Sequence, residues 1–346
     1  MKSINKSAIK LFLLKKAYIL FFLVLIFVNS SCRSTRYVTF NAVLPAEITF
    51  DPRIKSFLIV DHTLQEKKNL NIIEGVITGE KPGDDKKGVQ KLMLAFKRQV
   101  ETSDRFRVAI HPERIAGNSI LNVLPDPTDW EVIEQLAEEN DTDLVIFVES
   151  FDSNYDINPI NNIAHAQTSY VEAGLRIYDP VTRTIVDEQL FRQRFNSPPV
   201  GNTPLGVIRN MSDRSDAVAM AAEMAGMNYA QKISPSAYRL RRDFYSRGKK
   251  DRDVARGARY ADVNNWQEAK VVWEKALETT PKRKDAGRLC YDIAVAYEVL
   301  GDLDMAHQWA GRSFTDYKNK KGREYAQLIN RRKNSEAILR DQMEER

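Results

Sequence analysis

The sequence is poor in cysteine, with Cys32 and Cys290 as its only two among 346 residues. Two cysteines so far apart do not form the disulfide framework on which small secreted domains depend. Cys290 lies in an apolar helical pattern, so we expect a buried core residue rather than a reactive thiol. The fold must therefore be held by an apolar core, for which a chain of this length is sufficient.

Catalytic signatures are also missing from the sequence. No segment matches a phosphate-cradling glycine loop, a zinc-protease helix or a nucleophile elbow. The four histidines are far apart, and none has a cysteine or an acid at the spacing of metal ligands. We therefore expect no cofactor, no metal site and no catalytic residue, and we interpret the protein as not an enzyme.

The chain after the first 16 residues has no strong net charge. The formal net charge is +5, but five lysines lie within the first 16 residues. The remainder is close to neutral, which argues against a nucleic-acid partner, because such binding depends on phosphate neutralisation. Residues 239–346 hold 25 basic and 18 acidic side chains, so the part before them is acidic. This division indicates two domains with different surfaces.

Only one long hydrophobic run is present, the 12 residues from Ala17 to Val28. It is shorter than the roughly 20 residues that span a bilayer. Two lysines precede it, and small polar residues lead from it to Cys32, which is the order of a secretory signal. The segment resembles a bacterial lipoprotein signal. This resemblance implies that residues 1–31 are removed and that Cys32 carries a lipid; a plain signal peptide or an uncleaved anchor is the alternative.

Residues 54–235 alternate between strand and helix patterns, and residues 32–53 are expected to form a tether. Apolar or alternating runs predict strands at 57–60, 106–110, 143–148, 168–178 and 184–195. Helical spacing predicts helices at 89–100, 130–137 and 215–233. A capping box of Thr128 and Glu131 is expected to begin the second helix. The order β-α-β-α-β-β-β-α predicts an α/β sandwich in which one helical layer packs on a mixed sheet.

This order, with Val-Glu-Ala-Gly-Leu-Arg-Ile-Tyr-Asp-Pro at 171–180 as the best local match, resembles a known envelope domain. The domain is shared by the amino-terminal part of TolB, by lipoprotein activators of peptidoglycan synthases and by the curli-secretion lipoprotein. The resemblance implies an exported domain. No amphipathic hairpin pair able to line a pore is evident in the sequence, so the secretion-channel role is not carried over.

Residues 236–346 have a helical pattern throughout, and residues 239–242 are expected to begin a helical connector. Small and large residues recur at the spacing of the tetratricopeptide repeat. They are Gly257, Tyr260, Ala269, Trp273, Ala276 and Pro281 in one copy, and Ala294, Tyr297, Gly301 and Ala306 in the next. The segment is therefore similar to that all-α family, with residues 322–340 as a cap.

In the repeat family the first helix of each pair lines a concave face that binds peptides. Carrying this over by position gives a candidate partner groove of Val254, Ala258, Asp262, Arg288, Tyr291, Val295 and Glu298. Alternatively, this face docks on the α/β domain. Two basic runs, 282–284 and 331–333, either touch anionic headgroups or are merely solvated helix ends.

Together these patterns predict an α+β protein with an α/β sandwich followed by an all-α repeat domain. We interpret it as a lipid-anchored protein of the outer membrane, facing the periplasm, that acts as an adaptor for another envelope protein or peptide. One alternative is a cell-wall hydrolase, which would require Asp61, His62, Glu149 and Asp152 to converge. Another is a structural subunit of an envelope complex; the oligomeric state stays open.

Overall fold

The computed structural model describes residues 35–64, 84–117, 123–161, 164–201, 214–247 and 252–344. The chain forms two compact units. The α/β unit combines Asn41–Tyr238 with Asn334–Arg346, and the helical unit combines the described residues through Phe40 with Arg239–Lys333. The predicted α+β architecture is confirmed. The predicted leader, 1–31, and the predicted lipidation site, Cys32, lie outside the described residues.

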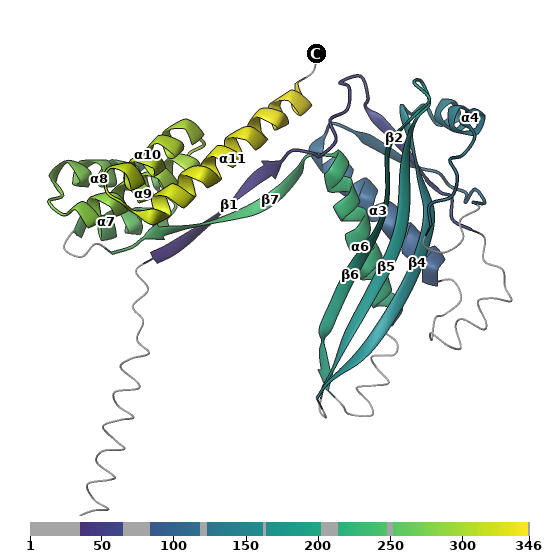
Figure 1. Ribbon diagram of the computed structural model, residues 1–346, viewed down its shortest axis with the longest axis horizontal. Coiled ribbons are helices and arrows are strands. Elements are labelled where there is room, and N and C mark those ends of the chain that lie inside the picture. The colour runs from purple at the N-terminus through teal and green to yellow at the C-terminus, as the bar shows by residue number, and fades with distance from the viewer. Residues whose placement is uncertain are drawn as a thin grey trace, which may run out of the picture. The chain divides into compact units, whose positions relative to one another are not determined.

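A five-stranded mixed sheet is the centre of the α/β unit (Figure 1). Its spatial order is β3-β2-β4-β5-β6. The strands are β2 (Ser56–Asp61), β3 (Arg107–Ile110), β4 (Leu144–Asn161), β5 (Ala164–Asp179) and β6 (Thr184–Gly201). Strand β2 runs parallel to β3 and β4, whereas β4, β5 and β6 are antiparallel neighbours. The predicted order of elements is confirmed.

Helices cover both faces of this sheet. Helices α3 (Asp84–Val100) and α6 (Arg214–Ile233) lie side by side on one face (Figure 1), and a short 3-10 turn, η1 (Glu101–Ser103), follows α3. Helix α4 (Trp130–Asn140) packs on the opposite face, against Leu58 and Val60. The expected single helical layer is therefore wrong. Strand β2 is apolar on both faces, so each face requires a cover.

Helix α4 begins one residue later than the expected capping box requires. Its N-cap is Asp129, which makes no side-chain capping bond. Thr128 instead donates its backbone N–H to the Tyr178 hydroxyl at 3.2 Å. Because the helix starts at Trp130, Glu131 occupies the second helical position rather than the third, and the predicted box is wrong.

Strands β1 (Thr35–Leu44) and β7 (Ser236–Tyr245) form a separate two-stranded sheet. Strand β1 lies within the residues expected to form a tether, and β7 contains residues 239–242. The expected helical connector there is wrong, because burial along β7 alternates with a period of two. The inward position Arg242 carries a charge, which hides the alternation of Leu240 and Phe244 in the sequence.

Five helices follow β7 in the described part of the chain. They are α7 (Arg252–Asp262), α8 (Trp266–Thr279), α9 (Arg283–Val299), α10 (Leu303–Thr315) and α11 (Lys320–Met343). Helix α8 packs against α7 and α9, and α9 also packs against α10. None of the helices within the described ranges has both the length and the apolar character needed to cross a bilayer.

The turns that join α7 to α8 and α9 to α10 have the same design. Each has a residue with positive φ, Asn264 at 60° and Gly301 at 90°, a conformation that asparagine and glycine tolerate best. The residue after each is an N-cap. The Asn265 side chain accepts from Glu268 N, and the Asp302 side chain accepts from Met305 N.

Near the end of α11, Gln342 is a buried residue of the α/β unit. Its side-chain amide accepts a hydrogen bond from Ala46 N at 2.9 Å and donates one to Ala46 O at 2.9 Å. It also donates to the Thr49 hydroxyl at 2.9 Å. These bonds join residues 296 and 293 positions apart in the sequence.

Candidate functional site

The residues assigned to the repeat motif lie where the helices of the helical unit meet. A Cβ on Gly257 would come within 2.2 Å of the Trp273 indole nitrogen, so helix α7 crosses that ring closely. Trp273 Nε1 donates to Val254 O at 3.2 Å. The alanines Ala269, Ala276, Ala294 and Ala306 are buried, Tyr260 and Tyr297 are half-buried, and Pro281 is exposed just before α9. The repeat assignment itself stays a prediction.

The proposed partner groove contains five buried residues, namely Val254, Ala258, Tyr291, Val295 and Glu298. Strand β7 of the same unit covers them. The Phe244 ring contacts Trp266 and Trp273 at centroid distances of 5.5 and 6.4 Å, and Tyr245 contacts Tyr291 at 5.5 Å. The other two groove residues are Asp262, which pairs with Arg36, and the half-buried Arg288. While β7 is in place, Val254, Ala258, Val295 and Glu298 offer no free surface to a partner. Tyr291 lines a pocket of about 490 Å³ together with residues of β7 and α11.

Glu298, one of these groove residues, joins three elements of the helical unit. Its carboxylate accepts from Arg242 of β7 at 2.7 and 2.9 Å, and from Arg332 of α11 at 2.8 Å. The Tyr325 hydroxyl of α11 also donates to it. Burial raises the pKa of Tyr325 well above its usual range, so the phenol stays a donor. Glu298 is therefore an internal connection between α9, β7 and α11.

Asp292 lies on α9 between the groove residues and is completely buried. Its Oδ1 accepts from the backbone N–H of Tyr245 at 2.7 Å, whereas Oδ2 has no hydrogen-bond partner within the described residues. Burial raises the pKa of the Asp292 carboxyl well above its ordinary value. The Tyr245 N–H and the charges of Arg288 and Lys321 act in the opposite direction, with smaller effects.

This shift predicts a pH dependence of stability that Asp292→Asn should reduce. The folded carboxyl holds its proton more tightly than the unfolded one, so its stabilising effect is full below the ordinary pKa of 3.8. That effect is lost as the pH rises towards the raised pKa. As the pH rises from about 4 to about 8, the wild type should lose unfolding free energy that Asp292→Asn keeps. The variant should therefore become more stable relative to wild type at the higher pH.

Urea unfolding at both pH values, followed by the fluorescence of Trp266 and Trp273, measures this difference. The asparagine keeps an oxygen acceptor for Tyr245, so the comparison tests the charge. Glu278→Gln, at an exposed position of the same unit, is the control. A difference between Asp292→Asn and wild type that stays constant with pH would contradict the prediction.

The four residues of the hydrolase alternative do not all converge. His62 Nδ1 lies 3.4 Å from Glu149 Oε2, and Glu149 also accepts from Tyr178 at 2.8 Å and from Arg176 at 3.1 Å. Both His62 and Glu149 are buried. The other two acids are directed elsewhere: Asp61 binds Arg114 at 2.8 Å, and Asp152 accepts from Asn154 at 2.9 Å.

Cys290 is buried in α9, as expected. Burial raises the pKa of the Cys290 thiol to about 12, so the thiol remains neutral in the physiological range.

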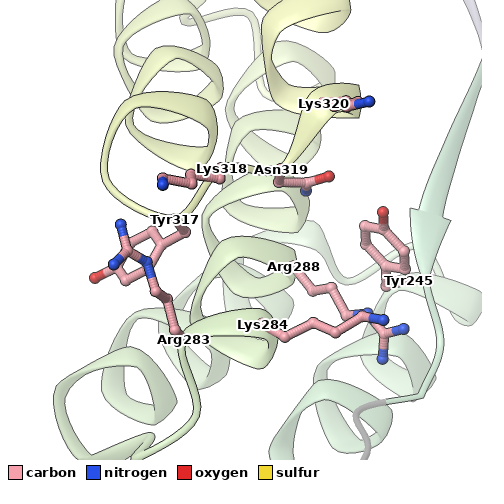
Figure 2. Close-up of a pocket in the computed structure, with 8 residues that line it drawn as sticks. All are labelled: Tyr245, Arg283, Lys284, Arg288, Tyr317, Lys318, Asn319 and Lys320. Carbon is pink, nitrogen blue, oxygen red and sulfur yellow. The ribbon is translucent and has the colours of Figure 1, made fainter.

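A pocket of about 690 Å³ opens on the helical unit. We call it the basic pocket. It is lined by Tyr245, Arg283, Lys284, Arg288, Tyr317, Lys318, Asn319 and Lys320. Figure 2 shows that these side chains come from three segments, namely the start of α9, the turn into α11 and the end of β7. Five of the eight residues are cationic.

Backbone carbonyls position two of the cations. Arg283 Nη2 donates to Asp316 O at 2.6 Å, and Arg288 Nη1 donates to Arg247 O at 3.0 Å. The Arg288 guanidinium lies 5.1 Å over the Tyr245 ring and 3.5 Å from the buried Asp285 carboxylate. A carbonyl fixes a guanidinium without neutralising it, so Arg283 keeps its full charge.

The three lysines of the basic pocket are exposed. Within the described ranges, Lys284, Lys318 and Lys320 form no ion pair with an acidic side chain. In Figure 2 the ammonium groups of Lys318 and Lys320 lie on opposite sides of Asn319. Asn319 itself is fixed, because its amide donates to Gly287 O at 3.1 Å and to the Ser313 hydroxyl at 3.0 Å. The cations therefore surround the opening without meeting at one point.

Only part of this pocket can be predicted from the sequence. The basic run 282–284 is evident there, but no pattern in the sequence connects it to Arg288, Lys318 or Lys320. The available signal was the type of residue at the helix starts. The first turn of α11 contains no acid, and α9 begins with Arg283 and Lys284, although acidic residues are favoured at such positions.

Comparisons with known proteins give two family matches. A family described as a domain of unknown function (DUF8603) matches residues 54–245, and a second, also described as a domain of unknown function (DUF6340), matches residues 255–337. No curated protein matches the sequence.

Several solved structures are similar to parts of the chain. A PelC dodecamer from Paraburkholderia phytofirmans is 8% identical, with 56% of this chain and 98% of that chain covered and a TM-score of 0.21. Lipoprotein GNA1162 from Neisseria meningitidis is 14% identical, with 46% and 93% covered and a TM-score of 0.22. The hypothetical protein CT253 from Chlamydia trachomatis is 9% identical, with 49% and 98% covered and a TM-score of 0.21.

At these identities and TM-scores, no functional conclusion passes from those structures to this chain. The family match over residues 54–245 does assign the chain to a family, because it extends over the whole five-stranded sheet and its helices. Since residues 54–245 make up more than half of the chain, the protein belongs to the family described as a domain of unknown function (DUF8603).

Proposed function

We propose that the protein is a lipid-anchored adaptor of the cell envelope that holds an anionic partner in the basic pocket. Cys32 would carry the lipid, and the protein would bind rather than catalyse. One observation carries the proposal. Four cations at the pocket, Arg283, Lys284, Lys318 and Lys320, have no acidic partner within the described residues. Clustered charge of one sign in a concave surface attracts the opposite charge.

The rest of the molecule is consistent with a binding role. The concave side of the helices is covered by β7, so the basic pocket, rather than the groove predicted by position, is the accessible hollow that we assign to the partner. Tyr245 and Tyr317 add aromatic surface beside the cations. A lipid anchor would raise the local concentration of the pocket at the membrane, so that weak contacts suffice.

Two variants of equal charge change test the role of the pocket in cells. The pocket variant combines Lys284→Gln, Lys318→Gln and Lys320→Gln. The control variant combines Arg256→Gln, Arg259→Gln and Lys275→Gln, at three exposed positions of the helical unit that do not line the pocket. After crosslinking, wild type and the control variant should capture the same partner, and the pocket variant should lose it.

Cys32→Ser tests the anchor separately. We expect it to leave the detergent phase and to keep the size of the uncleaved chain, because no lipid can be attached. A Cys32→Ser product that matches wild type in size and partitioning would overturn the anchor. Capture of the same partner by the pocket variant would overturn the role of the pocket.

A further inference from the structure

We infer that the basic pocket binds phosphate groups, and that its preferred ligand carries two of them. This inference rests on the proposed function, because it names the anionic group that the pocket would hold. It depends on the number of cations, on the way they are fixed and on their distribution around the opening.

The number of cations exceeds what a carboxylate requires. Five cationic side chains line the pocket, and among the described residues only Arg288 of these five forms an ion pair with an acid, Asp285. A carboxylate carries one negative charge and two oxygens, whereas a phosphate monoester carries close to two charges and three free oxygens. A phosphate therefore satisfies more of these donors in the same volume. The pocket volume of about 690 Å³ also leaves room for the group that the phosphate esterifies.

The two arginines are already positioned before any ligand arrives. Arg283 is held by Asp316 O and Arg288 by Arg247 O, so each guanidinium has a fixed location with other N–H groups left to donate. Preformed guanidinium forks favour phosphate, which accepts two parallel hydrogen bonds from them. The lysines add flexible point charges around these fixed groups.

The cationic groups lie on two sides of the pocket rather than at one point. Figure 2 shows the guanidinium of Arg283 on the same side as Lys318, whereas Lys284 and Arg288 end near Tyr245 on the other side. The free backbone N–H groups at the starts of α9 and α11 add positive potential near the pocket. Two anionic groups joined by a short linkage match this arrangement better than a single ion. Cations in the first turn of a helix are unfavourable, and the first turn of α11 contains no acid, so a bound phosphate would also relieve that repulsion.

Calorimetric titration of the full-length Cys32→Ser chain tests the inference. Pyrophosphate should bind more tightly than inorganic phosphate. The pocket variant in the same background should weaken pyrophosphate binding by about tenfold or more, since each lost charge-assisted contact is worth about that factor. The control variant should bind as the parent does.

Two further probes distinguish the source of the phosphate and the class of ligand. Vesicles of phosphatidylglycerol are compared with vesicles of phosphatidylcholine by co-sedimentation, and an acidic peptide without phosphate is titrated by calorimetry. Pocket-dependent binding of pyrophosphate supports a free or esterified diphosphate. Pocket-dependent binding of phosphatidylglycerol vesicles without pyrophosphate binding would identify lipid headgroups as the source of the phosphate. It would also overturn the preference for two phosphate groups, because each phosphatidylglycerol headgroup has one.

Pocket-dependent binding of the acidic peptide alone would overturn the inference and leave the adaptor proposal intact. The absence of pocket-dependent binding to every probe would also overturn it. The capture experiment in cells then decides separately whether the proposed function survives.

Discussion

Replacing Glu298 with alanine is expected to lower the unfolding free energy of the helical unit by about 3 to 5 kcal/mol, the cost of breaking a buried ion pair. The carboxylate is buried and accepts from Arg242, Arg332 and Tyr325. Alanine removes the acceptor that the buried Arg242 and the half-buried Arg332 share, and it leaves a cavity between β7, α9 and α11. Both effects act in the same direction.

Three of the four tryptophans, Trp266, Trp273 and Trp309, belong to this unit, so urea unfolding monitored by fluorescence reports mainly on it. Glu278→Ala removes an exposed carboxylate of α8 and should change stability by less than about 0.5 kcal/mol. Equal losses for the two variants would show that Glu298 does not hold β7 in place.

Gly226→Ala is expected to destabilise the α/β unit by about 2 kcal/mol. A Cβ at this position of α6 would come within 2.1 Å of Leu92 O in α3, and within 3.0 Å of Phe96 N. These are backbone atoms, so the two helices would have to separate over the sheet. Overpacking of this kind costs up to about 3 kcal/mol. The better helix propensity of alanine recovers only about 1 kcal/mol.

Hydrogen exchange measured by mass spectrometry localises this effect. Amides of β4, which contacts both helices, and of β2, which contacts α3, should exchange faster in Gly226→Ala, whereas those of α8 and α9 should not change. Met220→Ala, at an exposed position of the same helix, is the matched control and should leave exchange as in wild type. Unchanged exchange in β2 would contradict the prediction, because it would mean that α3 and α6 can move apart without destabilising the α/β unit.

The order of elements in the α/β unit could be predicted because the patterns behind it are local. The apolar run 57–60 and the alternating runs of the hairpin each identify a strand by themselves. Which helix covers which face could not be predicted, because a strand that is apolar on both sides carries no directional signal. The single layer was assumed, and α4 on the second face corrects it.

Less of the candidate site could be predicted from the sequence. The groove predicted by position in the repeat family consists mainly of buried residues, and the sequence does not show that β7 covers them. Strand β7 could not be predicted because Arg242 faces inward. A charged residue is normally a surface residue, and only the structure shows that Arg242 pairs with the buried Glu298. The basic pocket combines residues on either side of the α9–α10 hairpin. The basic residues near the start of α9 and those near the start of α11 are far apart in the sequence, so only the fold shows that they line one pocket.

The hydrogen bonds of Gln342 have a consequence for biosynthesis. Ala46 and Thr49 precede their partner in the sequence by 296 and 293 residues. A ribosome must therefore add 296 residues after Ala46 before the α/β unit can complete these contacts. Premature termination within α11 would leave that unit without these bonds, even though its sheet had already been synthesised.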